Sequence, residues 1–221
     1  FVNHGAGAFR DVSAEAGMSD SLLTGLPGGV SLSDVDHDGD LDIFVGGLLA
    51  PAPSTPSAAG LTFPSTWPGT RSLLLINATG PSTDNVPAPL TFAESSAKAH
   101  VLPAARRVTG AIFFDFDNDR DVDFAVASPS DGSTLFANQR DGTFADLGQA
   151  SGLPATAAIM GLTAGDYDKD GWTDLAATLW NGGLPRLLRN MGGSGPPGAT
   201  ATGSGAFAAD ASALAEVSRQ V

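Results

Sequence analysis

Residues 111–126 read AIFFDFDNDRDVDFAV, in which an aspartate-rich loop separates two short apolar runs. The runs Ala111–Phe114 and Val122–Val126 are bounded by turn-forming residues, as is typical of buried β-strands. The same pattern surrounds two other loops, Asp34–Asp42 and Asp166–Asp174, which resemble the central loop Asp115–Asp123. The sequence therefore predicts three β-hairpins, each carrying an aspartate-rich loop at its inner end.

A second pair of markers recurs between these hairpins. Predicted strands end in an asparagine at Asn3, Asn77, Asn138 and Asn190, and a further strand in each unit is marked by Phe9, Phe92, Phe144 and Phe207. The distance from the marker phenylalanine to the next aspartate loop is 25, 23 and 22 residues. Four strands in a unit of about 50 residues are typical of β-propeller blades.

The repeats divide the chain into blades. We expect an all-β propeller, or a fragment of one, with four antiparallel strands in each blade. The expected units within 1–221 are a partial blade at 1–18, a blade at 27–101 with insertions at 48–70 and 80–89, blades at 108–153 and 158–210, and a tail at 211–221. The end of the last unit could form a short helix over Ala208–Val217.

The acidic residues are concentrated in the loops, which hold 14 of the 24 in the chain. Like charges in such density are costly unless a cation is present. Each loop has carboxylates at positions 1, 3, 5 and 9, and position 7 can add a backbone carbonyl. The candidate ligands are Asp34, Asp36, Asp38, Asp40, Asp42, Asp115, Asp117, Asp119, Asp121, Asp123, Asp166, Asp168, Asp170, Trp172 and Asp174. Calcium takes six to eight oxygen ligands, so we predict about three Ca²⁺ ions.

Two details of the loops bear on the kind of metal site. Gly39 and Gly171 at position 6 permit a sharp turn, whereas Arg120 departs from this pattern in the second loop. An EF-hand would need an acid at position 12, but Val45, Val126 and Ala177 stand there. Magnesium is an alternative, although a flexible loop rich in carboxylates suits calcium better.

Together the two motifs resemble FG-GAP/VCBS repeats. The pattern Asp-x-Asp-x-Asp-Gly-x-x-Asp follows an apolar strand, and Asn-x-Gly-x-Gly-x-Phe lies between units. Residues 3–9 (NHGAGAF) carry the second motif in full, and residues 138–144 (NQRDGTF) carry it in a shifted form. The resemblance implies a β-propeller like that of integrin α chains, with calcium in the loop between the first two strands of a blade.

Other functions are less well supported by the sequence. The formal charge of −13 leaves no basic face for nucleic acid, and the absence of cysteine removes thiol chemistry and disulfides. No run approaches the roughly 20 apolar residues of a membrane helix. Paired carboxylates could indicate a glycosidase, but every close pair belongs to a metal loop. We therefore expect no enzyme.

The resemblance implies a secreted or cell-surface module for binding or adhesion, or a self-assembling structural one. Its partner would be a protein or a glycan, and the alternative is a lectin-like propeller or an accessory domain of a secreted enzyme. Open blade edges would allow a homo-oligomer, as a ring or a filament. Asn77-Ala78-Thr79 is a candidate glycosylation sequon. Because the chain starts at Phe1 without a signal peptide, we expect a processed form or part of something longer.

Overall fold

The computed structural model describes residues 1–3, 5–18, 22, 24–51, 66–82, 88–153, 158–192 and 207–209. Within these residues the chain is built from β-strands, with one short 3₁₀ helix at Gly148–Ser151. The strands are β1 Val2–Asn3, β2 Phe9–Arg10, β3 Leu26–Ser33, β4 Asp42–Leu49, β5 Leu73–Asn77, β6 Phe92–Glu94, β7 Gly110–Phe114, β8 Asp123–Ala127, β9 Thr134–Asn138, β10 Phe144–Asp146, β11 Ile159–Gly165, β12 Asp174–Leu179, β13 Arg186–Asn190 and β14 Phe207–Ala209. In this part of the chain no helix has the length and apolar character needed to cross a membrane.

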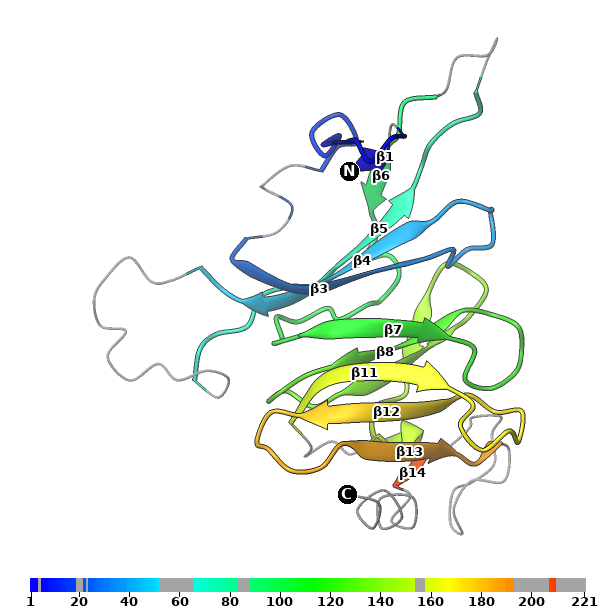
Figure 1. The fold of residues 1–221 in the computed structure, drawn as a ribbon. Helices are drawn as coiled ribbons and strands as arrows, with labels where there is room; N and C mark the ends of the chain where they lie inside the picture. The colour runs from blue at the N-terminus through cyan, green and yellow to red at the C-terminus, as the bar shows by residue number, and fades with distance from the viewer. Residues whose placement is uncertain are drawn as a thin grey trace.

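The strands form three four-stranded antiparallel sheets and one two-stranded sheet. Blade 1 is β3–β4–β5–β6, blade 2 is β7–β8–β9–β10 and blade 3 is β11–β12–β13–β14, each in chain order. Strands β1 and β2 pair with each other and form a half-blade. Figure 1 shows the three blades stacked face to face, with the half-blade beside the outer strands of blade 1. The prediction of an all-β fold made of propeller blades is therefore confirmed.

The pairing of the last two strands is the same in every unit. The terminal asparagine of one strand lies opposite the marker phenylalanine of the next: Asn3 opposite Phe9, Asn77 opposite Phe92, Asn138 opposite Phe144 and Asn190 opposite Phe207. Side chains alternate between the two faces of a strand. The shared register therefore gives equivalent residues of different blades the same orientation.

The core between blades 1 and 2 is centred on Phe124 of β8. Its ring lies 5.5 Å from that of Phe44 in blade 1, and 4.7 Å and 5.1 Å from those of Phe136 and Phe144 in blade 2. The core between blades 2 and 3 contains Phe116, Ala125, Leu135, Leu153, Leu175 and Leu188. Each inter-blade core is therefore formed by two facing sheets.

The segment after each marker phenylalanine also repeats its contacts. The amide of Phe144 donates to the carbonyl of Ala99 at 2.9 Å, and the amide of Phe92 donates to the carbonyl of Ala16 at 3.1 Å. Ala99 and Ala16 are both buried, at 2% and 1% exposure. The half-blade thus contacts the outer part of blade 1 as the outer part of blade 1 contacts blade 2.

The insertions expected from the sequence lie only partly within the described residues. Residues 52–65 and 83–87 are outside them, whereas Leu48 and Leu49 belong to strand β4. Near the described end of the first insertion, Trp67 donates its indole N–H to the carbonyl of Ala50 at 3.2 Å. The expectation of a helix over 208–217 is wrong at its start, because Ala208 and Ala209 lie in β14. Residues 210–217 are outside the described part.

Inner strands β3 and β7 approach closely where blade 1 meets blade 2. The amide of Gly29 donates to the carbonyl of Thr109 at 2.6 Å. A Cβ atom placed on Gly28 would lie 2.2 Å from the carbonyl oxygen of Val108. Glycine therefore permits the backbone contact between the two blades at this point.

We expect Gly28→Ala to destabilise the protein by about 1–3 kcal/mol, because the added methyl group must push the two strands apart. Gly80→Ala is the matched control, since a Cβ atom there meets nothing within 4 Å. The free energy of unfolding, measured in urea, would decide between them. Equal stability of the two variants would contradict the close approach.

Candidate metal centres

Each aspartate-rich loop joins the first two strands of its blade, and it brings carboxylates together. In all three loops the acids at positions 1, 3 and 9 offer oxygen atoms within 4.8 Å of one another. The sets are Asp34, Asp36 and Asp42; Asp115, Asp117, Asp119 and Asp123; and Asp166, Asp168 and Asp174. An all-oxygen, acidic set is the ligand chemistry of a hard divalent cation, so these residues could hold a metal ion.

The turn at position 6 has the same geometry in every loop. Gly39, Arg120 and Gly171 have φ of 94°, 75° and 88°. Their amides donate to the carboxylate at position 1, at 3.1, 2.9 and 3.0 Å respectively. Arg120 therefore adopts the left-handed turn that glycine adopts in the other loops, although this conformation is costly for a residue with a side chain.

The acid at position 9 is buried and binds the backbone on two sides. Asp123 accepts hydrogen bonds from the amides of Phe116 at 3.2 Å and Asn138 at 2.8 Å. Asp42 and Asp174 make the same two bonds in their own blades, at 2.9 and 2.8 Å and at 3.1 and 2.7 Å. One carboxylate thus joins position 2 of the loop to the asparagine that ends the third strand.

Burial makes these carboxylates reluctant to ionise in the protein without metal. Burial raises the pKa of Asp123 to about 7, against the opposing effect of its two backbone hydrogen bonds. Burial and the neighbouring Asp119 charge are the main causes that raise the pKa of Asp117 to about 6. The pKa values of Asp42 and Asp174 are also raised, mainly by burial. A bound cation would favour the ionised form of all four carboxyls.

Positions 5 and 7 differ among the loops. Asp119 joins the second carboxylate set, whereas Asp38 and Asp170 at the same position lie outside theirs. The predicted position-7 ligands Asp40, Asp121 and Trp172 each donate their amide to the position-5 carboxylate at 2.9 Å. Position 5 therefore braces the turn in every loop, and only in the second does it also join the cluster.

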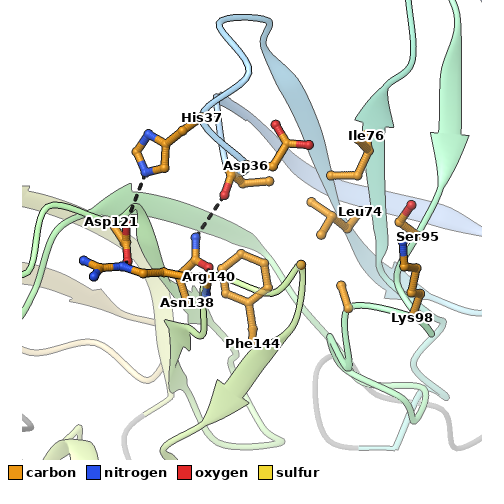
Figure 2. A pocket seen from close by; sticks show the side chains of 13 residues that line it. Asp36, His37, Leu74, Ile76, Ser95, Lys98, Asp121, Asn138, Arg140 and Phe144 are labelled. Carbon is orange, nitrogen blue, oxygen red and sulfur yellow. Dashed lines mark hydrogen bonds and ion pairs between the residues drawn. The ribbon is translucent and has the colours of Figure 1, made fainter.

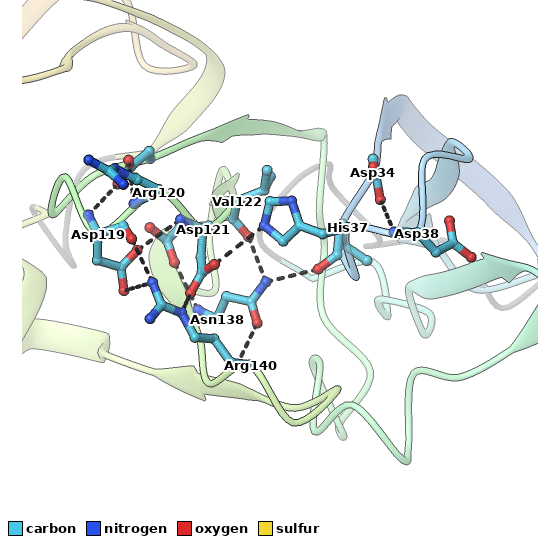
Figure 3. Close-up of polar contacts among 12 residues, drawn as sticks. Asp34, His37, Asp38, Asp119, Arg120, Asp121, Val122, Asn138 and Arg140 are labelled. Carbon is cyan, nitrogen blue, oxygen red and sulfur yellow. Dashed lines mark hydrogen bonds and ion pairs between the residues drawn. The ribbon is translucent and has the colours of Figure 1, made fainter.

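The side chain of Asp121 takes part in a contact between loops that the sequence did not predict (Figure 3). It forms an ion pair with Arg140, whose guanidinium also donates to the carbonyl of Asp119 at 2.5 Å. His37 of the first loop lies with Nε2 3.3 Å from Asp121. Similarly, Asn118 donates to the carbonyl of Gly171 in the third loop at 3.0 Å. Position 4 of one loop thus contacts the next loop.

A basic side chain also contacts the third loop. Arg189, the residue before the terminal asparagine, lies 2.6 Å from Asp168 and 2.9 Å from Asp170. Asp168 belongs to the third carboxylate set. Arg189 therefore supplies positive charge to a candidate metal ligand when no ion is bound.

The terminal asparagines connect neighbouring blades. The side-chain Nδ2 of Asn138 donates to the carbonyl of Val122 in its own loop at 3.2 Å and to the carbonyl of Val35 in the preceding blade at 2.9 Å. Asn190 does the same with Thr173 at 3.2 Å and Phe116 at 2.7 Å. The sequence marked these asparagines as strand ends, and their recurrence after each loop was the only sign of this further role.

A pocket of about 380 Å³ lies between the first loop and blade 2. Its walls combine apolar side chains, Leu74, Ile76 and Phe144, with the charged residues Asp36 and Lys98. Figure 2 shows His37 facing Asp121 at one end of the pocket and Ser95 beside Lys98 at the other. The pocket therefore offers both apolar and charged contacts next to a candidate metal loop.

We expect Asn190→Ala to lower the free energy of unfolding by about 2–3 kcal/mol, because it leaves buried backbone groups without partners. Asn77→Ala is the control, since the side-chain amide of Asn77 donates only to the carbonyl of Leu41 in its own blade, at 3.4 Å, and its loss should cost about 1 kcal/mol or less. Urea denaturation measures both values. If the Asn77 variant loses as much as the Asn190 variant, the contact between blades is not the reason.

The raised pKa values predict how stability depends on pH in chelator. Between the ordinary carboxyl pKa of about 4 and the folded-state value of about 7 for Asp123, the folded protein binds more protons than the unfolded chain. The free energy of unfolding should therefore fall as pH rises through this window. Asp123→Asn should reduce the slope. Urea midpoints across the window that rise with pH would contradict the expected burial effect.

Comparison with known proteins bears on the family. Residues 91–177 match the family model described as FG-GAP-like repeat, and this range contains the second and third loops in full. A search of curated proteins finds no match. The first loop lies outside the matched range but gathers its acids at the same positions. Residues 91–177 of this chain are therefore similar to FG-GAP-like repeats.

Proposed function

We propose that this protein is a calcium-stabilised, non-enzymatic binding or adhesion module that works outside the cell. The observation that carries the proposal is the repeated gathering of carboxylates at positions 1, 3 and 9 of three equivalent loops. FG-GAP repeats suggest a propeller-like binding module. Ion sites at the same place in each repeat fit a role in holding that module together.

Calcium fits these loops better than magnesium. Magnesium requires near-ideal octahedral geometry at short distances and usually keeps several waters, whereas calcium accepts more oxygens in a flexible arrangement. The loops offer three or four carboxylates each, and we propose one calcium ion per loop. Binding would compensate the cost of holding buried acids such as Asp123 in the ionised form.

Binding explains the remaining features better than catalysis. The close carboxylate pairs belong to structural loops whose oxygens also bind backbone amides. The pocket next to the first loop, with apolar walls and the exposed Lys98, would suit a side chain of a protein ligand. We propose a protein partner at the cell surface. Self-assembly through open blade edges and glycosylation of Asn77 stay predictions.

Glycan binding is the second candidate function. Trp180 is 46% exposed and Tyr167 is 40% exposed, both in blade 3. Exposed aromatic rings can stack on the apolar faces of sugars, so these side chains favour a lectin-like or enzyme-accessory role. A glycan array would distinguish the two. Selective binding that Trp180→Ala abolishes would replace the protein partner with a glycan.

We expect chelation to lower the melting temperature and calcium to restore it, with magnesium much less effective. A ligand that binds only the folded state adds about 2.7 kcal/mol per site at a hundred times its dissociation constant. Differential scanning calorimetry would measure the shift. Asp34→Asn, Asp115→Asn and Asp166→Asn combined should remove the response to calcium. An identical melting curve in chelator and in calcium would refute the structural role of the ion.

We expect Arg189→Gln to tighten calcium binding at the third loop by about two- to tenfold, because the guanidinium competes with the ion for Asp168 and Asp170. The same change should lower stability in chelator, where Arg189 is the counter-charge. Arg186→Gln, on the same strand, is the control and should do neither. Calorimetric titration of single-loop variants gives the affinities. Unchanged or weaker binding would mean that Arg189 does not compete.

A further inference from the structure

One face of blade 1 exposes apolar side chains that are covered in blade 2. Val30 and Leu32 of β3 are 66% and 60% exposed. Their register partners are Val45 and Ile43 of β4. In blade 2 the same positions are Ala111 and Phe113, paired with Val126 and Phe124, and all four take part in the core shared with blade 1. The exposed residues therefore form the inner half of a blade-to-blade surface.

The outer half of the same face is in contact with the N-terminal half-blade. The amide of Phe92 donates to the carbonyl of Ala16 there, as Phe144 does to Ala99 between blades 1 and 2. Strand β1 pairs with β2 alone within the described residues. Its other edge therefore presents backbone groups that can pair with a further strand.

Two asparagines beside this surface make fewer contacts than their counterparts. The backbone amides of Asn138 and Asn190 each donate to a position-9 carboxylate, and their side-chain amides donate to the carbonyls at position 8 of their own loop and position 2 of the preceding blade's loop. The backbone amide of Asn77 likewise donates to Asp42, but its side-chain amide donates to the carbonyl at position 8 alone, at 3.4 Å. The side chain of Asn3 accepts a bond from the amide of Gly5 at 2.8 Å, as its counterparts do within their own turns.

We propose that this surface binds a β-hairpin whose loop carries the aspartate pattern of this protein. The second strand of the hairpin would pair with β1, and its apolar side chains would cover Val30 and Leu32. Its position-9 carboxylate would accept the amide of Asn3, and its position-8 carbonyl would accept the side chain of Asn3. Its position-2 carbonyl would accept the side chain of Asn77.

The same contacts in blade 2 specify the chemistry of this hairpin. The hairpin β3–β4 of blade 1 and its loop cover Ala111 and Phe113, the residues of blade 2 that are equivalent to Val30 and Leu32. The apolar residue at position 2 of that loop, Val35, is 5% exposed. Phe116 at the same position is 1% exposed between blades 2 and 3. The bound loop should therefore have an apolar residue at position 2 and aspartate at position 9.

A second copy of this chain is not the occupant that these contacts favour. Each of its three hairpins already pairs with a third strand of its own blade: β4 with β5, β8 with β9 and β12 with β13. Releasing one would break those ladders and the position-9 bonds. The occupant is instead a β-hairpin that belongs to none of the three blades of this chain. This inference deepens the proposed binding function and does not depend on calcium.

A cyclised peptide of residues 159–179 is a suitable probe, because Ile159 and Leu179 are paired and the closure preserves the hairpin. Circular dichroism first establishes that it is folded. Saturable binding to the whole protein is expected, measured by fluorescence anisotropy in calcium and in chelator. Asp174→Ala in the peptide should weaken binding, since Asp174 occupies position 9. A folded peptide that does not bind would overturn the proposal.

Leu32→Glu in the protein should weaken peptide binding by at least about tenfold, because it places a charge on the surface to be buried. Leu184→Glu, in the turn before β13, is the matched control: Leu184 is 61% exposed against 60% for Leu32. Equal loss in both variants would overturn the proposal. So would a dimer, seen by light scattering, that Leu32→Glu dissociates, because a second copy would then cover this face. Calcium titration of the same variants tests the metal sites separately.

Discussion

The buried carboxylate at position 9 of each loop is the constraint on which the remaining structure depends. Asp123 binds the amide of Phe116 in its own loop and the amide of Asn138 at the end of the third strand. It therefore fixes the position of the loop relative to three strands of the sheet. Once Asn138 is held in this way, its side chain can reach the preceding blade at Val35. The carboxylate of Asp123 thus orders the strands within blade 2 and also positions the asparagine that contacts blade 1.

The same constraint links the metal to the fold. A carboxylate that holds two backbone amides must be buried, and burial raises its pKa. The other acids of the same loop lie nearby, and their negative charge makes ionisation of this carboxyl still more costly unless a cation is present. In the third loop Arg189 supplies part of that charge. A bound divalent ion would supply it in all three loops, and for this reason ion binding and stability should change together.

Sequence patterns predicted what repeats within the chain. The aspartate loops, the strands around them, the strand that ends at Asn138 and the strand marked by Phe144 follow from spacing, because a repeated local pattern implies a repeated local structure. The contacts between repeats could not be predicted in this way. The position of His37 beside Asp121, and of Arg140 across the second loop, depends on how one blade is rotated against the next. Nothing in the composition of a single loop encodes that rotation.

The contacts between blades also have a direction. At both contacts between complete blades, the asparagine of the later blade donates to the loop of the earlier blade, as Asn138 does to Val35 and Asn190 to Phe116. A surface that continues this order is not self-complementary, since one side offers donors and the other offers carbonyls. Association through it is therefore heterologous rather than two-fold symmetric. The donor side is the one that carries Asn3 and Asn77, and any blade added there must bring an aspartate loop with its carbonyl at position 2 facing blade 1.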